Sequence, residues 1–181
     1  MPFHHLALAT RDIKAIDTFY THAMGFELVK VEAAATPEGG WAKHFFYSTG
    51  NGEMMAFWEL HVEALPQDFE TGLSKAVGLP QWVNHLAFDP GSMEALQAAR
   101  ERWLAHGYHV LEIDHGWCYS IYTQDPNGTL VEWCVTTAEF DAADREKARK
   151  AVESDDIELE QAKPSTQMHY AKIKPLHKRT D

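Results

Sequence analysis

Two stretches of the chain repeat one pattern, and this repeat constrains the fold more than any other feature. The segment FHHLAL at residues 3–8 returns as VNHLAF at residues 83–88, with a histidine at the same place in each. Short apolar runs that partly alternate are typical of β-strands. Repetition on this scale indicates that one structural unit occurs twice in the chain.

A helix is expected after each of these strands. The first spans about residues 12–24 and ends at Gly25, a residue suited to closing a helix. The second spans about residues 92–106, between the N-cap Ser92 and Gly107, with an apolar stripe on one side.

Three further strands follow each helix. The last two strands of each half are joined by matching turns, TGNG at residues 49–52 and DPNG at residues 125–128. Asn-Gly and Asp-Pro-Asn-Gly segments between apolar runs indicate hairpins. The strands are expected at residues 27–32, 42–48 and 54–60, and at residues 109–113, 118–124 and 129–135.

These elements predict an α+β protein made of two tandem βαβββ modules, with a C-terminal helix and an extended tail. Residues 138–152 have a helical pattern, whereas residues 153–181 show no period. The tail is either a disordered end or an arm that lies across a partner subunit. The expected units are a first module at 1–60, a linker at 61–82, a second module at 83–137 and the C-terminal part at 138–181.

Composition excludes several classes of function. The 181 residues are 45% hydrophobic, enough for a real core, and carry a net charge of −11. That charge argues against nucleic acid or an anionic membrane as a partner. The chain has no apolar run that could span a membrane and no signal-peptide pattern. Its two cysteines, Cys118 and Cys134, lack CxxC spacing and suit reduced thiols. We therefore expect a cytoplasmic protein.

Three residues form a candidate metal site. His5 and His85 occupy equivalent positions in the two modules, and Ala7 and Ala9 leave space on the face of His5. Glu132 lies in the apolar segment LVEWC, where burial of a carboxylate is costly without a partner. A metal ion would provide that partner. The alternatives are structural histidines and a glutamate that faces solvent.

The segments HHLAL, NHLAF and DHGWCYSIYTQDPNGTLVEW, together with the repeated βαβββ order, resemble the vicinal oxygen chelate superfamily. It includes glyoxalases, bleomycin-resistance proteins, fosfomycin-resistance enzymes and type I extradiol dioxygenases. The resemblance spans about residues 3–137. It implies that the modules pair into a cupped mixed β-sheet around a metal that binds adjacent oxygen atoms of a substrate. First and fourth strands supply the ligands, here His5, His85 and Glu132.

The first module departs from this pattern at Ala56, which takes the place that Glu132 has in the second. Glu53 and Glu59 are three residues away, on the opposite face of a regular strand unless a bulge intervenes. Two histidines and one carboxylate are favoured by non-haem Fe(II) oxygenases. Glyoxalase-type isomerases in the superfamily usually have four protein ligands. Fe(II) is therefore preferred, with Mn, Ni or Zn as alternatives.

The second module resembles extradiol dioxygenases further. Tyr122 stands ten residues before Glu132, as in those enzymes, and His115 lies slightly upstream. The resemblance implies that His115 is an acid–base catalyst and that Tyr122 hydrogen-bonds a substrate oxygen. Tyr122 and Glu132 share a face only if the hairpin pairs in an even register. The alternatives are that Tyr122 is an ordinary strand aromatic and that His115 is simply a turn residue. Interior positions of the first module are expected for Trp41, His44, Phe46 and Trp58.

Three functions follow. The leading one is a dioxygenase-like enzyme acting on a small catechol-like substrate. The second is a glyoxalase-like isomerase or lyase, or a glutathione-type transferase, with Mn, Ni or Zn. The third is a small-molecule binding protein of the bleomycin-resistance kind, and retention of His5, His85 and Glu132 argues against it. Members of the superfamily often pair, so a homodimer is expected.

Overall fold

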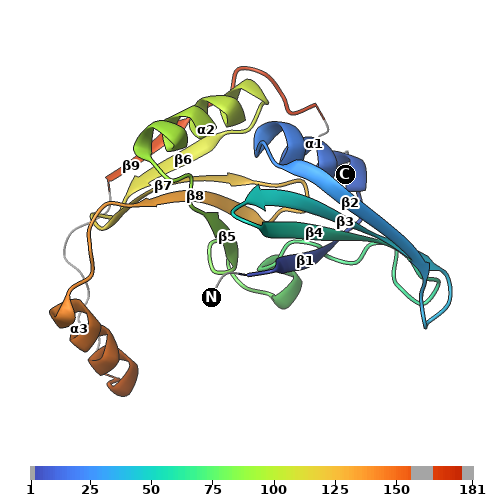
Figure 1. Ribbon diagram of the computed structural model, residues 1–181, viewed down its shortest axis with the longest axis horizontal. Helices are drawn as coiled ribbons and strands as arrows, with labels where there is room; N and C mark the ends of the chain where they lie inside the picture. Colours follow the sequence, from blue (N-terminus) through green and yellow to red (C-terminus); the bar gives the residue numbers. More distant parts are fainter. Residues whose placement is uncertain (1–2, 156–164, 177–181) are drawn as a thin grey trace.

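The computed structural model describes residues 3–155 and 165–176, which form two β-sheets and three α-helices (Figure 1). The α+β class and the repeated βαβββ order are confirmed. The first repeat consists of β1 (His5–Thr10), α1 (Ile13–Thr18), a π-helical turn η1 (Phe19–Ala23), β2 (Glu27–Ala35), β3 (Trp41–Gly50) and β4 (Glu53–His61). The second consists of β5 (His85–Phe88), α2 (Met93–Ala105), β6 (Val110–Asp114), β7 (Cys118–Gln124) and β8 (Leu130–Thr136). Outside the repeats lie a 3₁₀ turn η2 (Lys75–Val77), α3 (Ala142–Glu153) and β9 (Ser165–His169).

The two modules form separate sheets. Their strand orders are β1-β4-β3-β2 and β5-β8-β7-β6-β9, with the first strand of each module parallel to the fourth. β1 and β5 are therefore edge strands within the described residues. The prediction of one cupped sheet is wrong for the single chain, because each module forms its own sheet and no strand pairing joins β1 to β5 within the described residues.

One hydrophobic core joins the two modules. Alternate strand residues, such as Tyr47 and Phe57 in the first sheet and Val131 in the second, pack into the same cluster as the helices. α1 and α2 lie side by side over the sheets (Figure 1). The guanidinium of Arg102 in α2 donates hydrogen bonds to the carbonyl oxygens of Ala23 and Met24, at 2.8 and 3.0 Å. These contacts fix the relative orientation of the modules.

The turn between β7 and β8 forms a second contact between the modules. The buried carboxylate of Asp125 accepts hydrogen bonds from the Tyr20 hydroxyl at 3.1 Å and from the Thr129 amide at 2.9 Å. The Thr10 hydroxyl donates to the side-chain oxygen of Asn127 at 2.8 Å. The sequence marks this turn only as a hairpin. Tertiary structure makes it a connector between the modules.

The C-terminal part folds back on its own chain where the structure describes it. β9 pairs antiparallel with β6, whose free edge supplies the hydrogen bonds that a segment without apolar period needs. His169 Nε2 lies 3.1 Å from Glu112 Oε2. A Cβ on Gly107 would stand 2.4 Å from the backbone nitrogen of Pro175, so only glycine fits beneath the tail. Residues 156–164 and 177–181 of the expected tail lie outside the described residues.

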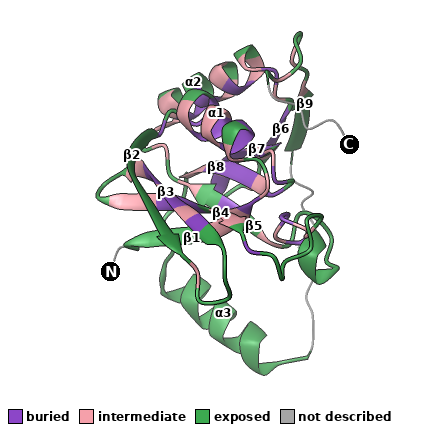
Figure 2. Cartoon of the chain, turned by 90° about the vertical axis from the view of Figure 1, so that its right-hand side faces the viewer, coloured by how far each residue is buried: buried purple, intermediate pink, exposed green. Residues whose placement is uncertain are grey.

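α3 projects away from the two sheets, and all of its residues are exposed (Figures 1 and 2). A capping box at Asp141 and Asp144 starts it, and Arg149 pairs with Glu146 and Glu153 along its surface. Local interactions therefore maintain this helix without a packed face. None of the helices in the described ranges is long and apolar enough to cross a membrane.

Asp125→Asn should flatten the dependence of stability on pH. Burial raises the pKa of Asp125 from 3.8 to about 7, so the folded chain keeps a proton that the unfolded chain releases. The protonated Asp125 side chain therefore contributes its full stabilisation at pH values below the pKa it has in the unfolded chain. This contribution is lost as the pH rises through the pKa it has in the folded chain. The free energy of unfolding should therefore fall between about pH 4 and 7 in the wild type and fall less in Asp125→Asn. Urea unfolding at several pH values measures both slopes.

Asp68→Asn is the matched control, because Asp68 is exposed. The free energy of unfolding of Asp68→Asn should depend on pH in the same way as that of the wild type. Parallel profiles for the wild type and Asp125→Asn would show that Asp125 ionises normally in the folded chain.

Candidate functional site

The candidate residues lie on the sheet faces that point away from the helices, which we call the open faces. In the first sheet, cross-strand pairing places Ala7 beside Ala56 and Ala56 beside Phe46, all on the open face with His5. The alternate residues of these strands fill the core. Because successive side chains of a strand point to opposite faces, the candidate site residues lie on one face of the sheet and the core residues on the other.

In the second sheet, His85 and Glu132 are in contact. His85 Nε2 lies 3.1 Å from Glu132 Oε2. The carboxylate belongs to a residue that is only 4% exposed, whereas the His85 side chain is 36% exposed. A buried Glu132 is expected to need a partner, and within the described residues His85 is that partner. This pair could donate one nitrogen and two oxygens to a metal ion.

Tyr122 and His115 extend this pair into a line of four side chains. Tyr122 stands directly opposite Glu132 in the β7–β8 ladder, which is the even register that a shared face requires. The Tyr122 hydroxyl lies 3.0 Å from His115 Nε2. Burial, with a further contribution from the Glu132 charge, raises the pKa of Tyr122 well above its usual range. Its hydroxyl therefore stays protonated near neutral pH and can donate a hydrogen bond.

His5 lies apart from this line. It is exposed at the start of β1, with its Nδ1 2.8 Å from Nδ1 of His4 and its ring against those of His44 and Phe46. Within residues 3–155 and 165–176, no three His, Cys, Asp or Glu side chains of one chain gather as a metal site. The structure thus brings His85, Glu132, Tyr122 and His115 together but leaves His5 in a separate half.

Aromatic rings surround His44 beside His5. The His44 ring stacks on Trp58 at 3.7 Å between centroids and lies 4.1 Å from the Phe46 ring. His44 and Phe46 are buried, as expected for interior positions, but Trp58 and Trp41 are exposed. Burial lowers the pKa of His44, and the charge of nearby His5 lowers it further. Its Nε2 is buried without a hydrogen-bond partner. The sequence indicates the position of His44 but not this unpaired nitrogen.

Neither neighbouring glutamate takes the place of a ligand at Ala56. Ala56 is fully buried on the open face. Glu59 pairs in register with Lys43 and lies 3.5 Å from its ammonium on the opposite face. Glu53 accepts a hydrogen bond from the amide of Phe3 at 3.1 Å, at the strand end where the ladder is irregular. The predicted vacancy in the first module therefore stands in the structure.

Both cysteines are free and share the open face with Glu132. Burial raises the pKa of Cys134 to about 12, so its thiol stays protonated at neutral pH.

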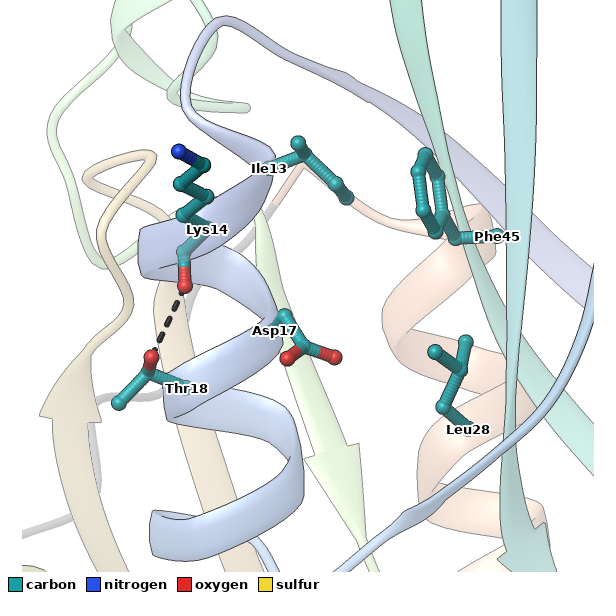
Figure 3. A pocket seen from close by; sticks show the side chains of 6 residues that line it. All are labelled: Ile13, Lys14, Asp17, Thr18, Leu28 and Phe45. Atoms are coloured by element: carbon teal, nitrogen blue, oxygen red, sulfur yellow. Dashed lines mark hydrogen bonds between the residues drawn. The ribbon is translucent and has the colours of Figure 1, made fainter.

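A surface hollow of about 330 Å³ lies elsewhere, on the helical side between α1 and the strands β2 and β3 (Figure 3). The carboxylate of Asp17 lines this hollow and accepts a hydrogen bond from the Tyr47 hydroxyl at 3.0 Å. The hollow has no second titratable partner for catalysis beyond Lys14. None of the candidate residues named above lines this hollow.

The glyoxalase/bleomycin resistance protein/dioxygenase superfamily model matches residues 3–133. Comparison with curated proteins finds no significant match. Similar solved structures include a glyoxylase/bleomycin resistance protein/dioxygenase domain from Frankia sp., with 16% identity, 75% of this chain and 98% of that chain covered, and a TM-score of 0.58. The fosfomycin resistance protein FosX from Listeria monocytogenes has 19% identity, coverage of 76% and 94%, and a TM-score of 0.52.

The antibiotic-binding protein TnmS3 from a Streptomyces species is 14% identical, with coverage of 76% and 97% and a TM-score of 0.51. At these identities the likeness to each structure shows the fold alone. The family model, in contrast, spans both modules from β1 to β8. The chain belongs to the glyoxalase/bleomycin resistance protein/dioxygenase superfamily.

Proposed function

We propose that the chain is a metal-dependent enzyme whose site is completed by two copies. His5 of one copy and His85 and Glu132 of the other would hold one divalent ion. The observation that carries the proposal is the division of the three residues. His85 and Glu132 are preassembled at 3.1 Å, while His5 is exposed on an edge strand of the other sheet. A twofold axis relates such half-sites reciprocally, so each dimer has two complete sites.

The edges of the sheets support a second copy as the missing neighbour. β1 and β5 each have one strand partner within the described residues. Exposed apolar side chains stand near both strands. Phe3 is 76% exposed and Trp82 is 71% exposed, with Leu6 and Val83 also exposed. Apolar side chains beside unpaired edges mark surfaces that associate.

The donor set fits a non-haem Fe(II) centre acting on a small catechol-like substrate with two adjacent oxygen atoms. Two imidazoles and one carboxylate leave positions open for substrate and oxygen. When bound, the ion would supply chelation of those oxygens and activation of dioxygen. The chain's own residues supply proton handling. The protonated Tyr122 hydroxyl would donate to a substrate oxygen, and His115, 3.0 Å away, would accept and return a proton.

A small-molecule binding protein without metal is the second candidate. It is favoured by the observation that one chain, within the described residues, does not assemble three ligands. An enzyme with Mn, Ni or Zn as a Lewis acid is the other form of the metal-dependent proposal. The nature of the bound ion separates these cases.

Glu132→Ala should abolish tight binding of Co(II) to the metal-free protein. Loss of a residue that only orients a ligand costs about 10- to 100-fold in metal affinity, so loss of a ligand should exceed this. Glu59→Ala is the control, since Glu59 is another strand glutamate of the same fold, partly buried, and lies on the opposite face. Calorimetric titration measures both. Equal Co(II) affinities of the two variants would show that Glu132 is not a metal ligand.

A mixture of His5→Ala and Glu132→Ala chains should regain sites that neither variant has alone. In a shared site, each mixed dimer keeps one intact set of ligands. Random pairing after co-expression should therefore restore about a quarter of the wild-type Co(II) stoichiometry. A site built within one chain would give no recovery.

Protein reconstituted anaerobically with Fe(II) should consume oxygen with at least one member of a panel of catechols. His115→Ala should lower the turnover rate by roughly 10²- to 10⁴-fold, the usual contribution of an acid–base group. Tyr122→Phe should lower it less, because it removes one hydrogen bond. An oxygen electrode measures the rates. Metal-loaded protein that consumes no oxygen with any diol would exclude ring cleavage.

A further inference from the structure

His44 has an unsatisfied polar atom at a place where a ligand could satisfy it. Its Nε2 is buried and has no hydrogen-bond partner, in a residue that is 6% exposed. An unpaired buried group of this kind is destabilising, so native proteins carry few of them without a reason. The described chain has similar atoms on four other residues, Arg11, Glu59, Trp103 and Trp133.

Position separates His44 from those four. Trp103 and Trp133 belong to the core between the sheets and the helices. Glu59 faces the helical side, where Lys43 pairs with it. Arg11 follows the end of β1. Of these unsatisfied groups, His44 is the one that shares the open face with His5.

The small residues of the first module let the two imidazoles approach each other. His44 stands on β3 and His5 on β1, with β4 between them. Ala7 and Ala56 are paired in register between these side chains and have no bulk that would separate them. The ring centroids of His5 and His44 are consequently 5.9 Å apart.

This distance favours a contact with substrate over ligation of the metal. Two imidazoles bound to one ion at about 2.1 Å have centroids about 4.6–5.3 Å apart at tetrahedral or cis-octahedral angles, and about 6.5 Å apart in trans positions. The separation of 5.9 Å between His5 and His44 matches neither arrangement. His44 is near enough, however, to reach a molecule held by the ion that His5 would bind. The rings of Phe46 and Trp58 both pack against the His44 ring and hold it in place.

We propose that His44 is a substrate-binding residue whose Nε2 hydrogen-bonds a polar group of a planar, oxygen-bearing aromatic substrate, with Phe46 as the apolar wall beside it. This inference rests on the proposed function. It adds a contribution of the first module to specificity, in the place left by the missing ligand at Ala56. Access to Nε2 requires movement of a neighbouring ring. The ring of His5 is exposed and packs against His44, so its reorientation on binding a metal would open this access.

The test is an anaerobic titration of the Fe(II)-loaded protein with 4-nitrocatechol, followed by its visible spectrum. His44→Phe should bind Fe(II) as the wild type does but should bind 4-nitrocatechol about tenfold more weakly, the effect of one lost hydrogen bond. His44→Gln, which keeps a polar group at the end of the side chain, should recover most of the affinity. A merely structural role would not give this recovery.

His61→Phe is the matched control. The His61 ring also stacks on a tryptophan, Trp41, at 3.6 Å, but His61 is exposed and lies 3.2 Å from Glu59. Its affinity for 4-nitrocatechol should equal that of the wild type. Thermal unfolding of each variant verifies that the fold is retained.

Two outcomes would overturn the inference alone. Unchanged 4-nitrocatechol affinity in His44→Phe would remove His44 from the substrate site, and loss of Fe(II) from His44→Phe would make it a metal ligand instead. Wild-type protein that binds Fe(II) but no 4-nitrocatechol would overturn both the catechol proposal and the role of His44. Wild-type protein that binds no metal would overturn the proposed function at its base.

Discussion

The contact between the helical sides of the two modules determines the rest of this structure. A single core joins η1 and α2 to both sheets, and Arg102 closes it by hydrogen bonds to the carbonyl oxygens of Ala23 and Met24. The buried Asp125–Tyr20 hydrogen bond adds a polar joint at the turn between β7 and β8. Because the modules meet on this side, no further strand of the described residues pairs with the outer edges of β1 and β5.

That geometry divides the candidate site into two unequal halves. The second module has an ordered polar line in which His85 contacts Glu132, Tyr122 stands opposite Glu132 and His115 contacts Tyr122. The first module has an exposed histidine, His5, beside a set of packed rings. A buried carboxylate needs compensation. Glu132 has a partner before any ion binds, which lets the half-site exist in a folded single chain.

The two halves also differ in chemistry. The second module presents a line of hydrogen-bonding side chains, whereas the first presents the exposed imidazole of His5 and packed rings around His44, whose Nε2 has no hydrogen-bond partner. Ala56 is the residue that creates this difference, since a carboxylate there would occupy the space in which the rings of His5 and His44 approach each other. In the proposed dimer, one copy would therefore supply most of the metal and proton chemistry, and the other would recognise the substrate.

The sequence by itself determined the repeated βαβββ order, the α+β class and the superfamily, because strand periodicity, turn residues and repeat spacing are local properties of the chain. It also predicted that Tyr122 and Glu132 could share a face, and the pairing of β7 with β8 decided that they do. Tertiary structure alone decided that the modules join through α1, η1 and α2, that residues 165–169 add a strand to β6, and that His5 lies apart from His85 and Glu132. These features depend on packing between segments distant in the sequence, for which a local pattern carries no information.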